Sequence, residues 1–151
     1  MGGQVENHKK EFGEAPILSI EVPQPTVILG QFSDLIESKS LMCLTGEGIN
    51  MSFSPRQDNV IRVVNTVRQD KKKFNYPNIK YRREDRWANA IKAVMSEMAK
   101  ENIKVRGYNI LISGRGAGAD SWSLTSSLYI GTLYGFSKLE DLKLKKDKIM
   151  E

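Results

Sequence analysis

Cysteine and histidine are almost absent from this chain of 151 residues, which contains one of each, Cys43 and His8. A single cysteine excludes a disulfide framework within the chain, and one cysteine with one histidine cannot complete a Cys/His zinc site. A lone histidine in a polar segment also argues against a Ser-His or Cys-His catalytic pair. The composition is typical of a protein from a reducing compartment, and we expect a cytoplasmic location.

Long apolar runs are missing as well. No stretch of eighteen or more apolar residues occurs, and residues 1–10 are polar where a secretory signal needs an apolar segment. We therefore expect neither membrane insertion nor secretion. The 23 Lys and Arg residues against 18 Asp and Glu leave a formal charge of +5, spread over local clusters. This mild excess does not indicate a nucleic-acid partner.

The first part of the chain divides into a polar arm and a strand-rich region. Residues 1–15 lack apolar periodicity and are predicted to form an N-terminal arm, either docked or frayed, and the domain proper covers residues 16–151. Residues 17–29 are rich in β formers but contain Pro23 and Pro25, which fits two strands or one kinked edge strand. Further short strands at hairpin spacing are predicted at 41–44, 49–53 and 60–64, separated by turn residues at 45–48 and 54–59.

The second part of the chain is dominated by helical patterns. Residues 68–85 are polar and form an outer strand or a loop, and apolar residues then recur at helical spacing over 86–100. A buried strand at 107–113 leads into a glycine-rich loop and a helix through residue 133, and a capping-box pattern at Ser137 starts a last helix. The order of these elements predicts an α+β fold with a mixed or mostly antiparallel sheet packed by helices.

A strand, a glycine-rich loop and a helix in succession can hold a phosphate through backbone N–H groups and the helix dipole. Two standard nucleotide motifs are excluded, because no Gly-Lys-Ser/Thr follows the loop and Ser121 stands where Gly-x-Gly-x-x-Gly requires its last glycine. The alternative is a flexible connection between strand and helix. The candidate phosphate-binding residues are Gly116, Ala117, Gly118, Ser121 and Ser123.

Five segments of the chain, in the same order, resemble the N-terminal half of the galactokinases, which belong to the GHMP family of small-molecule kinases. The segments are the lead-in at 8–16, ILGQFSD at 28–34 against the family's LIGEHTD, SPRQDN at 54–59 against SPRDDN, RWANAIKAV at 86–94 against WANYVKGV, and the strand at 107–114 before the phosphate loop GAGLSSSA. The treponemal type is the most similar. The resemblance covers nearly the whole chain but only the first third to half of a family member.

The resemblance implies a fold, a reaction and a set of residue roles. The implied fold is the GHMP kinase N-terminal domain, which is similar to the second domain of ribosomal protein S5. Family members transfer phosphate from ATP, with Mg²⁺, to the anomeric hydroxyl of galactose. Asp34 falls on the sugar-binding aspartate of the family, and Gly116-Ala117-Gly118 fall on the GAG of its phosphate loop. The residues that would hold the metal are not assigned.

Several positions depart from the family pattern. Pro25 stands where the family has its catalytic arginine, and Gln31 and Phe32 replace the sugar-contacting Glu and His. Residues 119–123 separate the GAG match from the Leu124-Thr125-Ser126-Ser127 that resembles LSSS. The catalytic aspartate of the family lies beyond the equivalent of Glu151. We assign no catalytic residue to this chain, because phosphoryl transfer depends on charges at these positions.

We therefore expect a truncated and degenerate galactokinase-like domain, without the C-terminal domain of the family and without kinase activity on its own. The alternative is a pseudokinase that binds a sugar or nucleotide and docks to a companion chain or to a second copy of itself. Such docking would use the face that the C-terminal domain covers in the family, since uncovered apolar patches are commonly contact surfaces. Nucleic-acid binding through the basic clusters at 71–73 and 82–83 ranks last.

Overall fold

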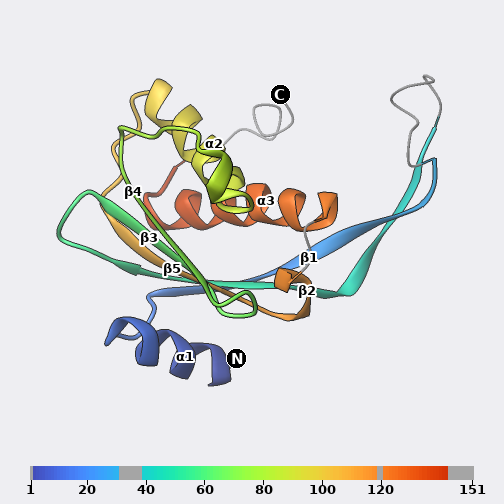
Figure 1. Ribbon diagram of the computed structural model, residues 1–151, viewed down its shortest axis with the longest axis horizontal. Coiled ribbons are helices and arrows are strands. Elements are labelled where there is room, and N and C mark those ends of the chain that lie inside the picture. The colour runs from blue at the N-terminus through green and yellow to red at the C-terminus, as the bar shows by residue number, and fades with distance from the viewer. Residues whose placement is uncertain (1, 31–38, 119–120, 143–151) are drawn as a thin grey trace.

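The computed structural model describes residues 2–30, 39–118 and 121–142, which form a five-stranded sheet with helices on both faces (Figure 1). In chain order the elements are α1 (Gly2–Phe12), β1 (Leu18–Leu29), β2 (Leu41–Pro55), β3 (Val60–Asn65), β4 (Asp70–Asn75), the 3-10 helix η1 (Arg83–Asp85), α2 (Ala88–Lys100), β5 (Tyr108–Ser113), the 3-10 helix η2 (Arg115–Gly118) and α3 (Trp122–Leu139). The strand order is β1-β2-β5-β3-β4, with β3 and β5 parallel and the other neighbours antiparallel. The predicted α+β fold with a mixed sheet is confirmed.

The main core lies between the sheet and the two helices α2 and α3, which share one face of it (Figure 1). Alternate residues of the central strands, such as Met51 and Phe53 of β2, are fully buried there. Two glycines bring α3 close to the sheet, since a Cβ atom on Gly135 would lie 2.5 Å from Cζ of Phe53 and one on Gly131 would lie 2.5 Å from Sδ of Met51. These two glycines therefore set the distance between α3 and the sheet.

The helix predicted from the apolar spacing at 86–100 is present as α2. It begins at Ala88, two residues after Arg86, whose backbone is in the left-handed region with φ 39°. It ends before Asn102, which also has a positive φ of 57°. The strand predicted at 107–113 is β5, and its position at the centre of the sheet explains why all but one of its residues are buried.

The strands predicted at 41–44 and 49–53 are one continuous strand, so the turn predicted at 45–48 is wrong. The pairing with β1 jumps from Pro23 opposite Gly48 to Gln24 opposite Thr45, which leaves Gly46 and Glu47 as the extra residues of a bulge. Glycine and polar residues suit a bulge as well as a turn, and the sequence pattern does not separate the two. The hairpin predicted between β2 and β3 is also wrong, because β5 lies between them.

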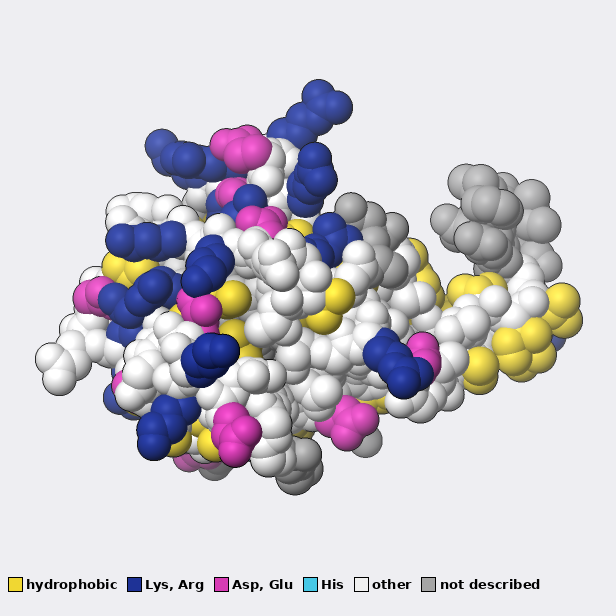
Figure 2. All heavy atoms as spheres, turned by 60° about the horizontal axis from the view of Figure 1, so that its bottom comes forward, with side chains coloured by type: hydrophobic (Ala, Val, Ile, Leu, Met, Phe, Trp, Pro, Cys, Tyr) yellow, Lys and Arg dark blue, Asp and Glu magenta, His cyan; other side chains and the backbone are white. Residues whose placement is uncertain are grey.

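Strand β1 is a single edge strand with an irregularity at its prolines, which agrees with one of the two readings of residues 17–29. The edge position accommodates Pro23 and Pro25, which have no N–H to donate. Beyond the helices, the pairs from Thr26–Cys43 to Leu29–Leu41 extend as a two-stranded ribbon, which we call the arm (Figure 1). Figure 2 shows apolar side chains exposed on the arm; the large ones are Ile28, Leu29, Leu41 and Met42, and the exposed Leu44 adjoins them.

Both ends of the described chain differ from the sequence-based expectation. Residues 2–12, expected as part of a polar arm without apolar periodicity that is either docked or frayed, form the helix α1, which is docked on the sheet face opposite α2 and α3 (Figure 1). This helix ends at Gly13, which has a positive φ of 81°. The helix α3 continues to Leu139, so Ser137 lies inside it rather than at the start of a new helix, and its hydroxyl donates to the carbonyl of Tyr134. The rest of the expected last helix lies outside the described residues.

Candidate functional site

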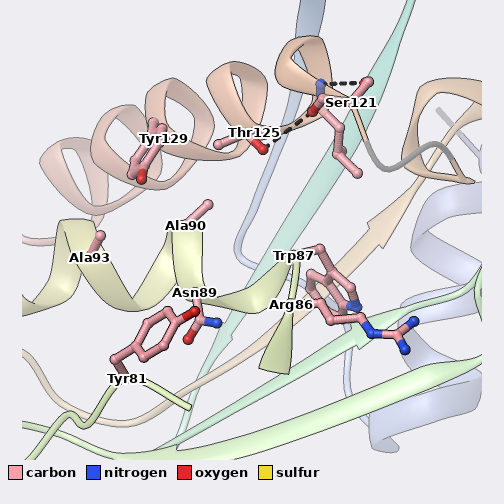
Figure 3. Close-up of a pocket in the computed structure, with 10 residues that line it drawn as sticks. Tyr81, Arg86, Trp87, Asn89, Ala90, Ala93, Ser121, Thr125 and Tyr129 are labelled. Atoms are coloured by element: carbon pink, nitrogen blue, oxygen red, sulfur yellow. Dashed lines mark hydrogen bonds between the residues drawn. The ribbon is translucent and has the colours of Figure 1, made fainter. Parts of the chain in front are cut away.

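A pocket of about 510 Å³ opens between α2 and the N-terminal half of α3 (Figure 3). This volume is within the range of small-molecule and cofactor sites. Small side chains of α2, Ala90 and Ala93, face α3 across it and leave the space open. The lining residues are Tyr81, Arg86, Trp87, Asn89, Ala90, Ala93, Ser121, Leu124, Thr125 and Tyr129.

The segment 80–87, which precedes α2, forms the outer wall of the pocket. Side chains of α2 hold this segment in place. Nδ2 of Asn89 donates to the carbonyl of Arg82 at 2.8 Å, and Nζ of Lys92 donates to the carbonyl of Lys80 at 2.9 Å. Lys92 also forms a largely buried ion pair with Asp85. These contacts fix the backbone on both sides of Tyr81, a residue that is 77% exposed and lines the pocket (Figure 3).

Arg86 and Trp87 form the corner where this segment joins α2. The positive φ of Arg86 costs a residue other than glycine about 1–3 kcal/mol, and such strain is concentrated at functional sites. Trp87 is buried, and its Nε1 donates to Oδ2 of Asp70 at 3.0 Å. Burial raises the pKa of Asp70, but hydrogen bonds from Trp87 and Lys72 outweigh burial and leave that pKa below its ordinary value. Asp70 therefore stays ionised and anchors the corner.

The start of α3 forms the inner end of the pocket. Ser121 is the N-cap, and its Oγ accepts from the backbone N–H of Leu124 at 3.1 Å (Figure 3). Oγ1 of Thr125 donates to the carbonyl of Ser121 at 3.2 Å and closes the first turn. The amide groups of a first helical turn and the helix dipole favour an anion at this end. An anionic group in the pocket would therefore be stabilised next to Ser121.

The glycine-rich loop lies beside this pocket rather than in its wall. Residues 115–118 form η2, and side chains of β1, of the end of β3 and of the β3–β4 connection donate hydrogen bonds to its carbonyl groups. Gln24 donates to the carbonyl of Gly116 at 3.1 Å, and Asn65 donates to that of Ala117 at 2.9 Å. Arg68 donates to the carbonyls of Ala117 and Gly118. A Cβ atom at position 116 would lie 2.6 Å from Nε2 of Gln24, so a larger residue there would have to displace the Gln24 side chain.

Pro25 of β1 lies against the first turn of α3. Oγ of Ser123 donates to the carbonyl of Pro25 at 2.7 Å, and Oγ of Ser127 donates to that of Pro23 at 3.1 Å. The nearby cation of η2, Arg115, pairs with Glu47 at 2.9 Å and is largely exposed. The position that the family resemblance assigns to the catalytic arginine is thus at the start of α3, and it carries an uncharged ring.

The five predicted phosphate contacts separate into two groups. Ser121 lines the pocket, and Ser123 belongs to the same helical turn but is bonded to β1. The other group lies in η2 and consists of Gly116, Ala117 and Gly118. Their carbonyl groups accept hydrogen bonds from Gln24, Asn65 and Arg68. Whether these residues contact a phosphate stays a prediction. The predicted sugar contact, Asp34, lies outside the described residues, as do Gln31 and Phe32.

The site contains residues that the sequence reasoning did not select, namely Tyr81, Arg86 and Tyr129. The family resemblance of residues 86–94 is the sequence signal that points to Arg86. Tyr81 and Tyr129 belong to no recognised motif, and only the packing of α2 against α3 brings them to one cavity. Within residues 2–30, 39–118 and 121–142, His, Cys, Asp and Glu side chains form no group of three that could hold a metal. In the same ranges no helix is long and apolar enough to cross a membrane.

The arrangement of the sheet and the helices is the fold of the GHMP kinases. Lactococcus lactis galactokinase, solved in complex with galactose, superimposes with a TM-score of 0.80 over 98% of this chain and 39% of its own, at 14% identity. Mevalonate kinase of Methanococcus jannaschii superimposes with a TM-score of 0.68 over 87% of this chain and 43% of its own, at 20% identity.

Two relatives found by sequence are named as galactokinases. A galactokinase of Clostridium tetani is 28% identical over 148 residues, which cover 91% of this chain and 38% of the relative. A Treponema pallidum protein assigned as a galactokinase is 28% identical over 105 residues, which cover 70% of this chain and 26% of the relative. No family model matches the chain. The chain is thus galactokinase-like, as its motifs predict, and it spans about a third of the length of these relatives.

Proposed function

We propose that this chain is the nucleotide-binding portion of a galactokinase-like sugar kinase, and that ATP binds in the pocket between α2 and α3. The observation that carries the proposal is the joint presence, in one cavity, of aromatic rings, a cation and a helix N-terminus. Tyr81 and Tyr129 offer faces for a base, and Arg86 and the first turn of α3 favour phosphate groups. Mg²⁺ would accompany the triphosphate and neutralise part of its charge.

Titration of the chain with ATP, with and without Mg²⁺, tests the binding proposal by calorimetry and by thermal shift. We expect saturable binding that Arg86→Gln weakens about tenfold, because the variant removes one charge-assisted contact to phosphate. Arg83→Gln is the matched control, since Arg83 lies three residues away and does not line the pocket. Absence of ATP binding, or equal weakening by both variants, would contradict a nucleotide site at this position.

We further propose that the chain transfers no phosphate by itself. The supporting observation is Pro25, which lies against the start of α3 where the resemblance expects an arginine. Phosphoryl transfer depends on cations that neutralise charge developing on the transferred group, and the proline ring supplies none. The test is incubation with ATP, Mg²⁺ and galactose, followed by measurement of sugar phosphate. Turnover above a buffer control would contradict this part of the proposal.

A second candidate function is that of a pseudokinase that docks to a companion chain or to another copy of itself. The apolar residues exposed on the arm favour it, together with Trp122, Ile130 and Tyr134 on the outer side of α3. Sedimentation over a range of concentrations, with and without ATP or galactose, tests this candidate. Association that Ile130→Lys or Leu44→Lys reduces would support it, and a monomer that no ligand stabilises would contradict it.

A further inference from the structure

The polar cluster beneath the sheet centres on His8, the only histidine of the chain, which is fully buried between α1 and β2. Nδ1 of His8 lies 2.8 Å from Oγ of Ser52, and Nε2 lies 2.9 Å from Oγ of Ser54. Both serines are themselves fully buried. The imidazole therefore has a polar partner on each side and no exposed surface.

The hydrogen-bond inventory assigns the proton on this ring. The hydroxyl of Ser54 donates to Oε1 of Glu14 at 2.6 Å, so it has no second proton to give to His8. Nε2 of His8 must then donate to Ser54, and Nδ1 is left to accept from the hydroxyl of Ser52. Each group in this hydrogen-bond network has a partner when the imidazole is neutral.

A second proton on the ring breaks the arrangement. Nδ1–H would point at Ser52, whose hydroxyl proton would lose its acceptor in a buried place. An unpaired buried polar group and a buried cation are both costly, whereas a His8 in water accepts the proton without either cost. Protonation therefore favours the state in which α1 has left the sheet.

The surface beneath α1 is mixed, with polar and apolar residues side by side. On this face Ser52 pairs with Leu111, Leu111 with Val64, and Ser54 and Arg62 with Asn109. Leu111 and Val64 are buried, so apolar contacts contribute to this layer beside the polar bonds.

The α1 side contributes Phe12, whose ring lies 4.8 Å from that of His8 and 5.7 Å from the Arg62 guanidinium. Nε2 of Gln4, one turn before His8, is buried without a hydrogen-bond partner among the described residues. Docking of α1 thus includes the hydrogen bonds of His8, which a second proton on the ring would disturb.

The charged groups that face this cluster come from several elements. Glu14 follows α1 and accepts from Ser54 and from Nδ2 of Asn109. Arg56 at the end of β2 donates to Oδ1 of Asn109 at 3.1 Å. Arg62 of β3 lies over Phe12, and Lys71 of β4 pairs with Glu11 of α1. Of these groups, Glu14 is the anion bonded into the His8 network.

We propose that α1 is a pH-sensitive element that docks on the sheet while His8 is neutral and is released when His8 takes up a proton. Burial lowers the pKa of His8 below its ordinary 6.5, although the charge of Glu14 opposes this shift. Well above pH 6.5 the ring is neutral in both the docked and the released state, so pH has no effect on docking there. As the pH falls below 6.5, the released state gains the proton first, and the docking equilibrium weakens by up to about tenfold per pH unit.

The test measures hydrogen exchange of the α1 amides in the whole chain between pH 7.5 and 5.0, as protection factors relative to α2. NMR of the His8 imidazole in the same samples gives its protonation. We expect α1 protection to fall by up to about tenfold per pH unit below pH 6.5, and to level off where the docked His8 itself becomes charged. Unchanged α1 protection between pH 6.5 and the midpoint of the His8 titration would overturn the proposal, as would a His8 midpoint at or above 6.5.

Two variants separate His8 from the other groups. His8→Gln cannot take up a proton, and we expect its α1 protection, whether high or low, to be independent of pH over the same range. Glu14→Gln keeps an acceptor for Ser54 but removes the charge that raises the pKa of His8, so the midpoint should move to lower pH. A pH-dependent loss that persists in His8→Gln, or a midpoint that rises in Glu14→Gln, would contradict the assignment.

Discussion

At the scale of single residues, Arg56 and Asp58 make the turn after β2 a rigid junction. Nε and Nη2 of Arg56 donate to the two carboxylate oxygens of Asp58 at 2.8 and 2.6 Å, and Nη1 donates to Asn109 of β5. The N–H of Gly107 donates to the carbonyl of Asp58 at 2.7 Å. The SPRQDN segment was expected to join two hairpin strands, and instead it connects β2, β3 and β5.

The Arg56 pairing predicts the titration of Asp58. Hydrogen bonding to Arg56 is the main cause that lowers the pKa of Asp58 to about 2. In Arg56→Gln we expect this pKa, followed by carboxyl NMR, to rise towards its ordinary value of 3.8. Because the native pKa is lowered, the contribution of Asp58 to stability is complete above pH 3.8 and is lost as the pH falls through 2.

Arg62→Gln is the control for that titration, since Arg62 lies over Phe12 and not beside Asp58. It should leave the pKa of Asp58 where it is in the unmodified chain. A value near 2 that survives in Arg56→Gln would show that the backbone N–H of Val60, a weaker partner at 3.1 Å, dominates instead.

At the scale of elements, the contact between α3 and β2 depends on glycine at two successive turns of the helix. Gly135→Ala should gain about 1 kcal/mol of helix propensity but lose about 1–3 kcal/mol by overpacking against Phe53, whose ring is fully buried. We expect a net loss of about 1 kcal/mol in the free energy of unfolding, measured with a chemical denaturant.

Gly131→Ala is the comparison for this effect. Its nearest neighbour is the flexible side chain of Met51, which can move aside more easily than an aromatic ring. We expect a smaller loss than for Gly135→Ala. If Gly135→Ala were the more stable of the two variants, the packing of α3 on Phe53 would be looser than described.

Sequence patterns were sufficient for the elements whose periodicity is local. The stripe that includes Ile91, Met95 and Met98 predicted α2, and the apolar run at 107–113 predicted a buried strand. The patterns failed for α1, because its contacts with the sheet are made by His8 and other polar residues rather than an apolar stripe. They also failed at Gly46, because a bulge and a turn use the same residue types.

The candidate site was predictable only in part, for the same reason. Ser121 was selected because a hydroxyl after a glycine loop is a local pattern, and the structure makes it an N-cap. Tyr81 and Tyr129 are 48 positions apart in the numbering and meet only because α2 packs on α3. A pocket formed by distant segments has no local signature, so its position depends on the whole fold.

At the scale of the whole molecule, the two faces of the sheet are bound to their helices by different forces. The α2 and α3 face buries a large apolar cluster, whereas on the α1 face serines, Asn109 and one histidine are hydrogen-bonded beside the buried Leu111 and Val64. Apolar burial is nearly insensitive to pH, and the polar cluster is not. A change of pH should therefore act on one layer of the molecule and leave the pocket layer in place.

The central position of β5 also has a consequence for how the chain assembles during synthesis. β2 and β3 are synthesised before β5. One edge of each strand therefore stays unpaired until residues 108–113 are added and pair with both strands. A ribosome must therefore add roughly half of the domain before the middle of the sheet can close, and pairings of such long sequence separation form slowly. Until then the nascent chain carries two unprotected strand edges, so this topology makes the growing polypeptide most vulnerable to aggregation just before it is able to fold.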